Sequence, residues 1–200
     1  MGKIKACQAE VIDNDPIEAY LLAYTSFDGS LSHGIQFCAT RVVCANTLAK
    51  AQNEGQAASG FKLRHTQSIQ DKLDKVQMQI DCAKRDFSRS IDTYRDLQRK
   101  KVNADWARRY AETLFLRFDA DKKPTAQSQN KVISVLDILL ASRDLEKVPA
   151  NYGTAWEAYN GVTRYLTHHA GRSDDSRLNS QWFGEAANIN NQALALAARM

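Results

Sequence analysis

The stretch Arg41-Val-Val-Cys-Ala-Asn-Thr-Leu48 marks a change of secondary structure, and the rest of the chain can be placed on either side of it. An apolar run ends at Val43. Asn46 or Thr47 then follows, and either side chain can accept a hydrogen bond from the free amides at the start of a helix. The stretch therefore predicts the end of a strand and a short helix over residues 48–52.

The residues upstream of this stretch predict three antiparallel strands. Apolar and polar residues alternate over 4–12, and residues 17–26 are rich in apolar and aromatic side chains. The returning strand spans residues 34–43. Asp28-Gly29 lies between the second and third strands, and this dipeptide is typical of tight hairpin turns.

The residues downstream predict helices. Apolar residues recur at steps of three and four over residues 68–101, which indicates one long amphipathic helix. Residues 119–130 and 171–179 are polar and are expected to be loops, and Trp182-Phe183-Gly184 is expected to anchor the last helix. The further helices are expected over residues 104–118, 131–142, 154–169 and 188–199, and the helix over 131–142 is expected to be well buried.

The predicted order of strands and helices defines the fold class. We expect an α+β protein with a small N-terminal antiparallel sheet that contains a hairpin, followed by a long helix and a helical C-terminal part. The sheet and the capped helix take residues 1–60, and the long helix with a helical hairpin takes residues 61–147. The C-terminal helices take residues 148–200 and are expected to pack on the same core, as one cooperative domain.

Composition excludes several classes of protein. The chain has 200 residues and a net charge of +4, and it contains no apolar run long enough to span a bilayer and no secretory signal. We therefore expect a cytoplasmic protein with no membrane partner. Its four cysteines form no C-x-x-C pair, and adjacent helical histidines point in different directions, so no metal and no cofactor are expected. No nucleophile, phosphate-loop or metalloprotease motif is present, so the chain is not expected to be an enzyme.

Basic residues gather along the predicted long helix and just after it. Lysine and arginine side chains can neutralise phosphates, and neighbouring aromatic rings can stack on unpaired bases. The alternative interpretation is a solvated helix face, because acidic residues interleave with the basic ones. The candidate nucleic-acid-binding residues are Arg41, Lys62, Arg64, His65, Arg95, Arg99, Lys100, Lys101, Arg108, Arg109 and Arg164.

Two further groups are candidates for binding a partner. Trp106 and Tyr110 lie four residues apart and predict an aromatic face on the second helix. Glu157, Asn160 and His168 share a polar face with Arg164 on the helix that starts near residue 154. This polar face could also be an ordinary solvated face of an amphipathic helix.

Several short motifs occur in order along nearly the whole chain. They are Tyr20-Leu-Leu22, Ser26-Phe-Asp-Gly-Ser30, Arg41-Val-Val-Cys-Ala-Asn-Thr-Leu48, Arg64-His65-Thr66, Gly153-Thr-Ala-Trp156, Tyr159-Asn160, His168 and Ser180-Gln-Trp-Phe-Gly184. On these motifs the chain resembles the phage and plasmid family DUF932, and the resemblance implies that it corresponds to the C-terminal core of that family. The resemblance also implies a location on mobile genetic elements, and it implies no settled activity. Phe27 and Gly161 depart from the family pattern, which usually has histidine and alanine there.

Two functions remain as hypotheses. The first is a phage- or plasmid-encoded protein that binds or anneals single-stranded DNA during recombination or replication and that self-associates. A hairpin sheet backed by helices suggests this by analogy with the strand-annealing proteins of phages. The alternative is a protein-binding inhibitor of a host defence complex, with the long helix and the Trp106 and Tyr110 face as its contact surface.

Overall fold

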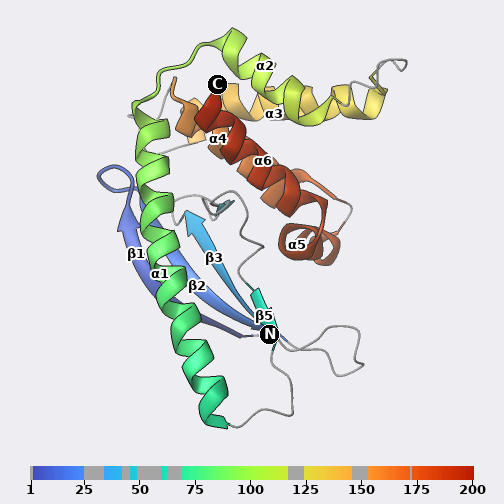
Figure 1. Ribbon diagram of the computed structural model, residues 1–200. Helices are drawn as coiled ribbons and strands as arrows, with labels where there is room; N and C mark the ends of the chain where they lie inside the picture. The colour runs from blue at the N-terminus through green and yellow to red at the C-terminus, as the bar shows by residue number, and fades with distance from the viewer. Residues whose placement is uncertain are drawn as a thin grey trace.

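The computed structural model describes residues 2–24, 34–41, 46–48, 60–62, 69–116, 124–145, 153–171 and 173–200. An antiparallel sheet forms the N-terminal part and helices form the rest, which confirms the α+β class (Figure 1). The predicted hairpin turn at Asp28-Gly29 lies outside the described residues, as do Arg64 and His65.

Three strands make up most of the sheet, as predicted. They are β1 (Gly2–Glu10), β2 (Pro16–Tyr24) and β3 (Gly34–Arg41), and each pairs antiparallel with the next. Two short strands, β4 (Asn46–Leu48) and β5 (Gly60–Lys62), pair with opposite ends of β3 along its outer edge.

The prediction that Asn46 caps a helix is wrong. Asn46 lies opposite Arg41, and Leu48 lies opposite Ala39, so the chain reverses and returns along β3. Pairing with β3 gives the backbone of this segment the hydrogen bonds that a helix would have supplied. The cap signal was local, and the tertiary pairing outweighs it. Residues 49–52 of the predicted helix lie outside the described residues.

The turn between β1 and β2 places one carboxylate inside the protein. Asn14 adopts a left-handed backbone with φ of 63°, a conformation that asparagine tolerates better than most residues. The backbone amide of Asp15 donates to the carbonyl of Ile12 at 3.1 Å, and the whole of Asp15 is buried. On β2, Ile17 and Ala19 are also fully buried, so this face of the strand points into the core.

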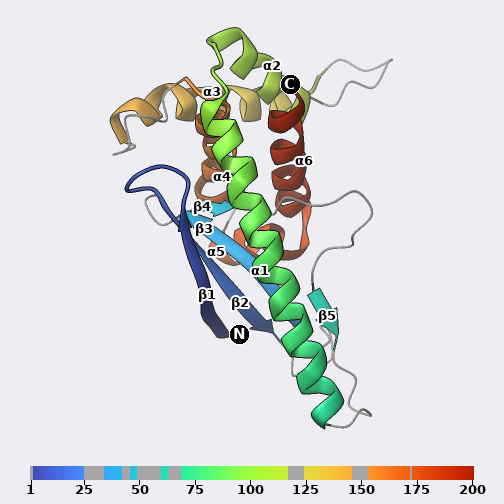
Figure 2. The same cartoon turned by 60° about the vertical axis from the view of Figure 1, so that its left-hand side comes forward.

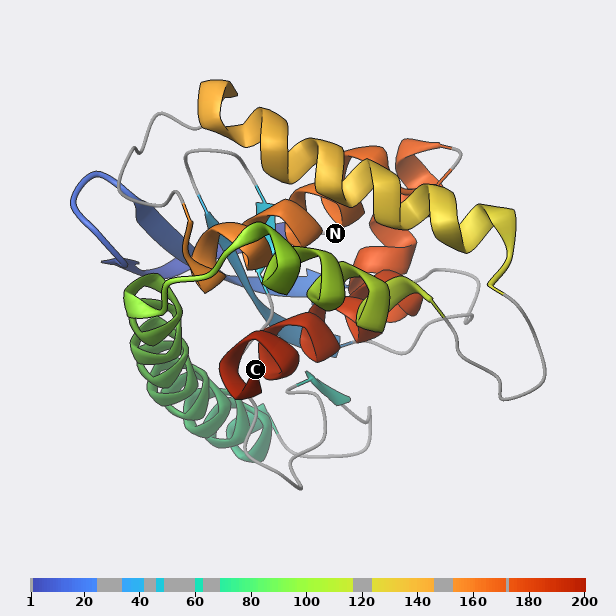
Figure 3. The same cartoon turned by 90° about the horizontal axis from the view of Figure 1, so that it is seen from above.

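The long helix and the helix after it occur where the sequence predicted them. Helix α1 (Ile69–Arg99) runs along the sheet in two views (Figures 1 and 2). It buries Phe87, Ile91, Tyr94 and Leu97, which are part of its predicted apolar stripe. Helix α2 (Ala104–Phe115) turns away at the end of α1 and lies beside α3 (Ala126–Leu145), as the view from above shows (Figure 3).

Helix α4 (Ala155–Arg164) lies at the centre of the protein. Residues 155–163 are all buried, and α4 contacts α1, α3, α6 and β4. A π-helical segment, Tyr165–His169, continues it. One hydrophobic cluster extends from β2 through α1 and α4 to α6 (Glu185–Arg199). In the described part of the chain, no helix has the length and apolar character needed to cross a membrane.

Two predicted loops are partly helical. Helix α3 begins at Ala126, where the hydroxyl of Thr125 accepts a hydrogen bond from the amide of Ser128 at 3.2 Å. Helix α5 (Asp174–Phe183) replaces the predicted linker, because Ser173 caps it and acidic side chains fill its first turn. These caps lie within polar runs that were predicted to be loops.

The expected deep burial of α3 is also incorrect in part. Val132 and Val135 are buried, but Ile133 is 54% exposed. Over its described side chains, helix α3 therefore packs along one side, on α2, α4 and the π-helical segment that follows α4. The side chains of Trp182 and Phe183 lie outside the described residues, so the predicted anchor stays a prediction.

Helices α3 and α4 approach each other closely at Gly161. A Cβ atom added there would lie 2.4 Å from Leu139 Cδ2 and 2.7 Å from Leu139 Cγ.

We therefore expect Gly161→Ala to lower the free energy of unfolding by about 1–2 kcal/mol, because overpacking outweighs the gain in helix propensity. Urea denaturation measures this change. The double variant Gly161→Ala/Leu139→Ala should be more stable than the sum of the single changes predicts; strict additivity would contradict the close contact.

Candidate nucleic-acid interface

A buried ion pair ties the sheet to the central helix. Arg41 Nε, at the end of β3, donates to Asp15 Oδ1 at 2.6 Å, and both side chains are fully buried. Trp156 Nε1, on α4, donates to the other carboxylate oxygen of Asp15 at 3.2 Å. The Arg41 guanidinium carbon also lies 5.6 Å from the centroid of the Trp156 ring, within the range of a cation–π contact.

This network corrects the prediction for Arg41. An arginine with no exposed surface cannot reach a phosphate in solution, so Arg41 is a structural residue here. A buried cation needs a buried anion, and Asp15 supplies it. Sequence analysis missed both Asp15 and Trp156. A signal was available, since Asp15 lies in a turn-forming run before Pro16 and Trp156 lies in one of the family motifs.

The predicted polar face of α4 is mostly inside the protein. Thr154 caps the helix by accepting from the amide of Glu157, and Glu157 accepts from the amide of Gly153 in return. Asn160 is 1% exposed, and its side-chain amide donates to the carbonyl of Trp156. Glu157 and Asn160 are therefore not available to a partner, whereas His168 is exposed.

The predicted aromatic face of α2 is also buried. The rings of Trp106 and Tyr110 stack with centroids 5.0 Å apart, and both residues belong to the core. The hydroxyl of Tyr110 donates to the carbonyl of Ala193 at 2.9 Å, which joins α2 to α6. Burial raises the pKa of Tyr110 well above its ordinary value, so the phenol stays protonated and remains a donor. The structure overturns the prediction of an exposed partner-binding surface here.

Two of the predicted phosphate-binding cations hold the fold together instead. Lys100 Nζ donates to the carbonyl oxygens of Ala197 at 3.0 Å and Ala198 at 3.4 Å, which lie in the last turn of α6. A cation at the C-terminal end of a helix is favourable, because it satisfies carbonyls that lack partners in the helix. Arg95 is half-buried and donates to the carbonyl of Glu10 at 2.9 Å, at the end of β1.

Four other predicted cations are exposed where α1 meets α2. We call this group, Arg99, Lys101, Arg108 and Arg109, the corner cations. Arg99 forms an ion pair with Asp96 at 3.0 Å, but its side chain is 76% exposed and such surface pairs are weak. Within the described residues, no ion pair is found for the other three. The side chain of Lys62 lies outside the described residues, so it stays a prediction.

The π-helical segment at the end of α4 adds little positive charge. Arg164 is half-buried. Burial lowers the pKa of His169, and the nearby side chains of Arg164, His168 and Arg177 lower it further, so this imidazole is neutral at pH 7. Across the described ranges, no group of three or more histidine, cysteine, aspartate or glutamate side chains is arranged to hold a metal ion.

The fold and the surface define an α+β protein with a polar network in its core and a group of exposed cations at one helix corner. A family model matches residues 3–182 and is described as a domain of unknown function, DUF932. The chain belongs to this family. No match to the chain was found among curated proteins or solved structures.

The buried ion pair predicts a large loss of stability when one charge is removed. Asp15→Asn leaves the Arg41 guanidinium buried without a negative charge, and we expect the free energy of unfolding to fall by about 3–5 kcal/mol. Asp92→Asn is a matched control, because Asp92 is 71% exposed and pairs with Arg95 on the surface. It should change stability by less than about 0.5 kcal/mol. Urea denaturation at pH 7 compares the two, and equal effects would contradict the structural role of Asp15.

Proposed function

We propose that this protein binds single-stranded nucleic acid through the corner cations and has no catalytic activity of its own. The observation that carries the proposal is the exposure of Arg99, Lys101, Arg108 and Arg109 around the short connection between two helices. Cations of this kind bind phosphates and release the counterions condensed on the nucleic acid. Binding driven in this way weakens steeply as salt is added.

The mode of binding is directed at the strand backbone. Trp106 and Tyr110 were the aromatic residues expected to stack on bases, and both are core residues. Without stacking from these two rings, the contacts are electrostatic, so affinity depends little on base sequence. Compared with the hypothesis from sequence, the proposed site keeps only four of the cations and does without stacking by Trp106 and Tyr110.

The phage and plasmid setting implied by the family resemblance suggests a role in recombination or replication of a mobile element. Strand annealing with self-association is part of this proposal and rests on analogy at the level of the fold. For the alternative, an inhibitor of a host defence complex, the Trp106 and Tyr110 part of the expected contact surface is buried, which leaves the long helix as its candidate contact surface.

The salt dependence of binding tests the proposal. We expect a labelled single strand to bind at low salt. The triple variant Lys101→Ala/Arg108→Ala/Arg109→Ala should reduce the slope of log affinity against log salt by about 2, because each phosphate that is no longer neutralised lowers the slope by about 0.7. Fluorescence anisotropy with oligonucleotides of several base compositions measures both the slope and the sequence dependence.

A second triple variant controls for net charge. Lys84, Arg85 and Arg89 are also exposed and lie on α1 away from the corner, and their change to alanine removes the same charge. This variant should keep most of the affinity. Equal reductions in the two variants would contradict a site at the corner, and the absence of binding by the unaltered protein at low salt would overturn the proposal. Light scattering with and without the strand tests self-association.

A further inference from the structure

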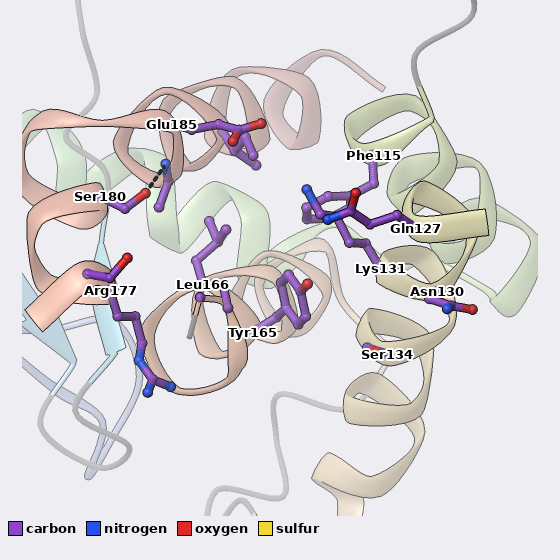
Figure 4. Close-up of a pocket in the computed structure, with 15 residues that line it drawn as sticks. Phe115, Gln127, Asn130, Lys131, Ser134, Tyr165, Leu166, Arg177, Ser180 and Glu185 are labelled. Carbon is purple, nitrogen blue, oxygen red and sulfur yellow. Dashed lines mark hydrogen bonds between the residues drawn. The ribbon is translucent and has the colours of Figure 1, made fainter. Parts of the chain in front are cut away.

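Basic side chains gather around the π-helical segment that follows α4, and the proposed function does not use them. The segment ends in two adjacent histidines, and Arg177 of α5 donates to the carbonyl of the first. In Figure 4 the side chain of Arg177 extends beside the helix that carries Tyr165 and Leu166. We call this group the π-end cluster, and its members are Arg164, His168, His169 and Arg177.

The π-helical turn brings two members of the cluster together. The amide of Ala170 donates to the carbonyl of Tyr165 at 2.8 Å, which is the bond between residues five apart that defines a π-helix. Arg164 and His169 are also five residues apart. On a regular α-helix their side chains would point about 140° apart, because each residue turns the helix by about 100°. The wider turn reduces this angle, so a single ligand can contact both.

Arg177 adds a second guanidinium from the neighbouring helix. It donates to the carbonyl of His168 and, at 2.7 Å, to the carboxylate of Asp174. These two bonds leave most of the N–H donors of the guanidinium unused. The side chain of Asp174 is 99% exposed, so water screens its charge strongly. The side chain of Arg164 has no ion pair or hydrogen bond to another residue within the ranges that the structure describes.

The members of the cluster repel one another electrostatically. Burial lowers the pKa of His169, and the other three members of the cluster lower it further. The cavity that borders the segment (Figure 4) carries one charge of each sign, from Lys131 of α3 and Glu185 of α6, so it does not offset the charge of the cluster. An anion bound between the two guanidinium groups would relieve the repulsion. Both histidines are exposed, so a ligand can reach the cluster from solvent.

From this arrangement we infer that the π-end cluster binds a phosphate group that carries two negative charges. The guanidinium groups of Arg164 and Arg177 supply the positive charge, and their planar shape matches the geometry of phosphate oxygens. The imidazole of His169 donates to a further oxygen and takes up a proton from solvent when the anion binds. A carboxylate has one negative charge and two oxygens, so it would leave part of the cluster unused. The phosphate belongs to a small molecule or to the end of a nucleic-acid strand, because both present the same group.

Calorimetric titration of the full chain with inorganic phosphate at pH 8 tests the inference. We expect saturable binding that weakens about tenfold in Arg164→Met, since one charge-assisted hydrogen bond is removed. Arg89→Met is the matched control, because Arg89 is an exposed arginine on α1 outside the cluster. It should bind phosphate as the unaltered chain does. Two results would overturn the inference: no saturable binding, or equal weakening in the two variants.

Sulfate isolates the contribution of His169, because its two negative charges do not change between about pH 5 and 8, where histidine titrates. A bound dianion raises the pKa of His169 from its lowered value, so the affinity for sulfate should rise as pH falls through the pKa of the complex. His169→Gln, a change at an exposed position, should still bind sulfate at pH 8 and show a smaller rise. NMR titration of the imidazole measures the pKa, and an equal pKa with and without sulfate would contradict the inference.

Competition distinguishes the two sources of the phosphate group. An oligonucleotide with a 5′-phosphate and the same strand without it compete with bound sulfate, in the triple variant that lacks three corner cations. Stronger competition by the phosphorylated strand supports the site and assigns it to strand ends. No competition by either strand assigns it to a small molecule, and equal competition by both would contradict the preference for two charges on one group.

The π-end cluster is separate from the corner cations. Those cations lie near the start of α4, where Lys101 pairs with Thr154, and α4 itself spans about 15 Å between the two places. Arg164→Met and His169→Gln leave the corner untouched. Strand binding through the corner is therefore measured separately, and either proposal can fail without the other.

Discussion

The buried charge pair between Asp15 and Arg41 is the constraint on which the rest of the structure depends. It places a carboxylate from the first turn and a guanidinium from the end of β3 against Trp156, at the start of the central helix. Each charge is costly to bury alone, so the three elements must come together for any one of them to be satisfied. The sheet and the helices are therefore held in one arrangement by polar contacts, although apolar residues supply most of the core.

Much of the fold could be predicted from periodicity. The stripe of apolar residues on α1 and the alternation in β1 are local patterns; the structure has a helix and a strand there, and Phe87, Ile91, Tyr94 and Leu97 of the stripe are buried. Prediction failed at two places for different reasons. Asn46 carries a cap signal, but β3 offers its segment a strand pairing. The polar run before Phe183 forms a helix that Ser173 caps, although its polar residues had indicated a linker. A cap and a turn share the same residue types, so composition cannot separate them.

The candidate site shows the same limit for charge. Sequence alone gave Arg41, Lys100 and Lys101 equal standing as phosphate ligands. The structure separates them: Arg41 is buried against Asp15, Lys100 holds the end of α6, and Lys101 is exposed. The exposure of Trp106 and Tyr110 was equally open from sequence, since an aromatic pair four residues apart on a helix fits a core as well as a surface. The solvent exposure of a side chain depends on how elements far apart in the chain pack together, so a local sequence pattern does not predict it.

The two ties on α1 have a consequence for recognition. Lys100 fixes the end of α1 to the last turn of α6, and Arg95 fixes it to the end of β1, on either side of the exposed Arg99. The backbone around Arg99 is thus held in place on both sides. In the proposed complex, the loss of conformational freedom on association would fall on the flexible nucleic acid rather than on this part of the protein. Under the same proposal, long-range attraction rather than a folding step would set the rate of encounter.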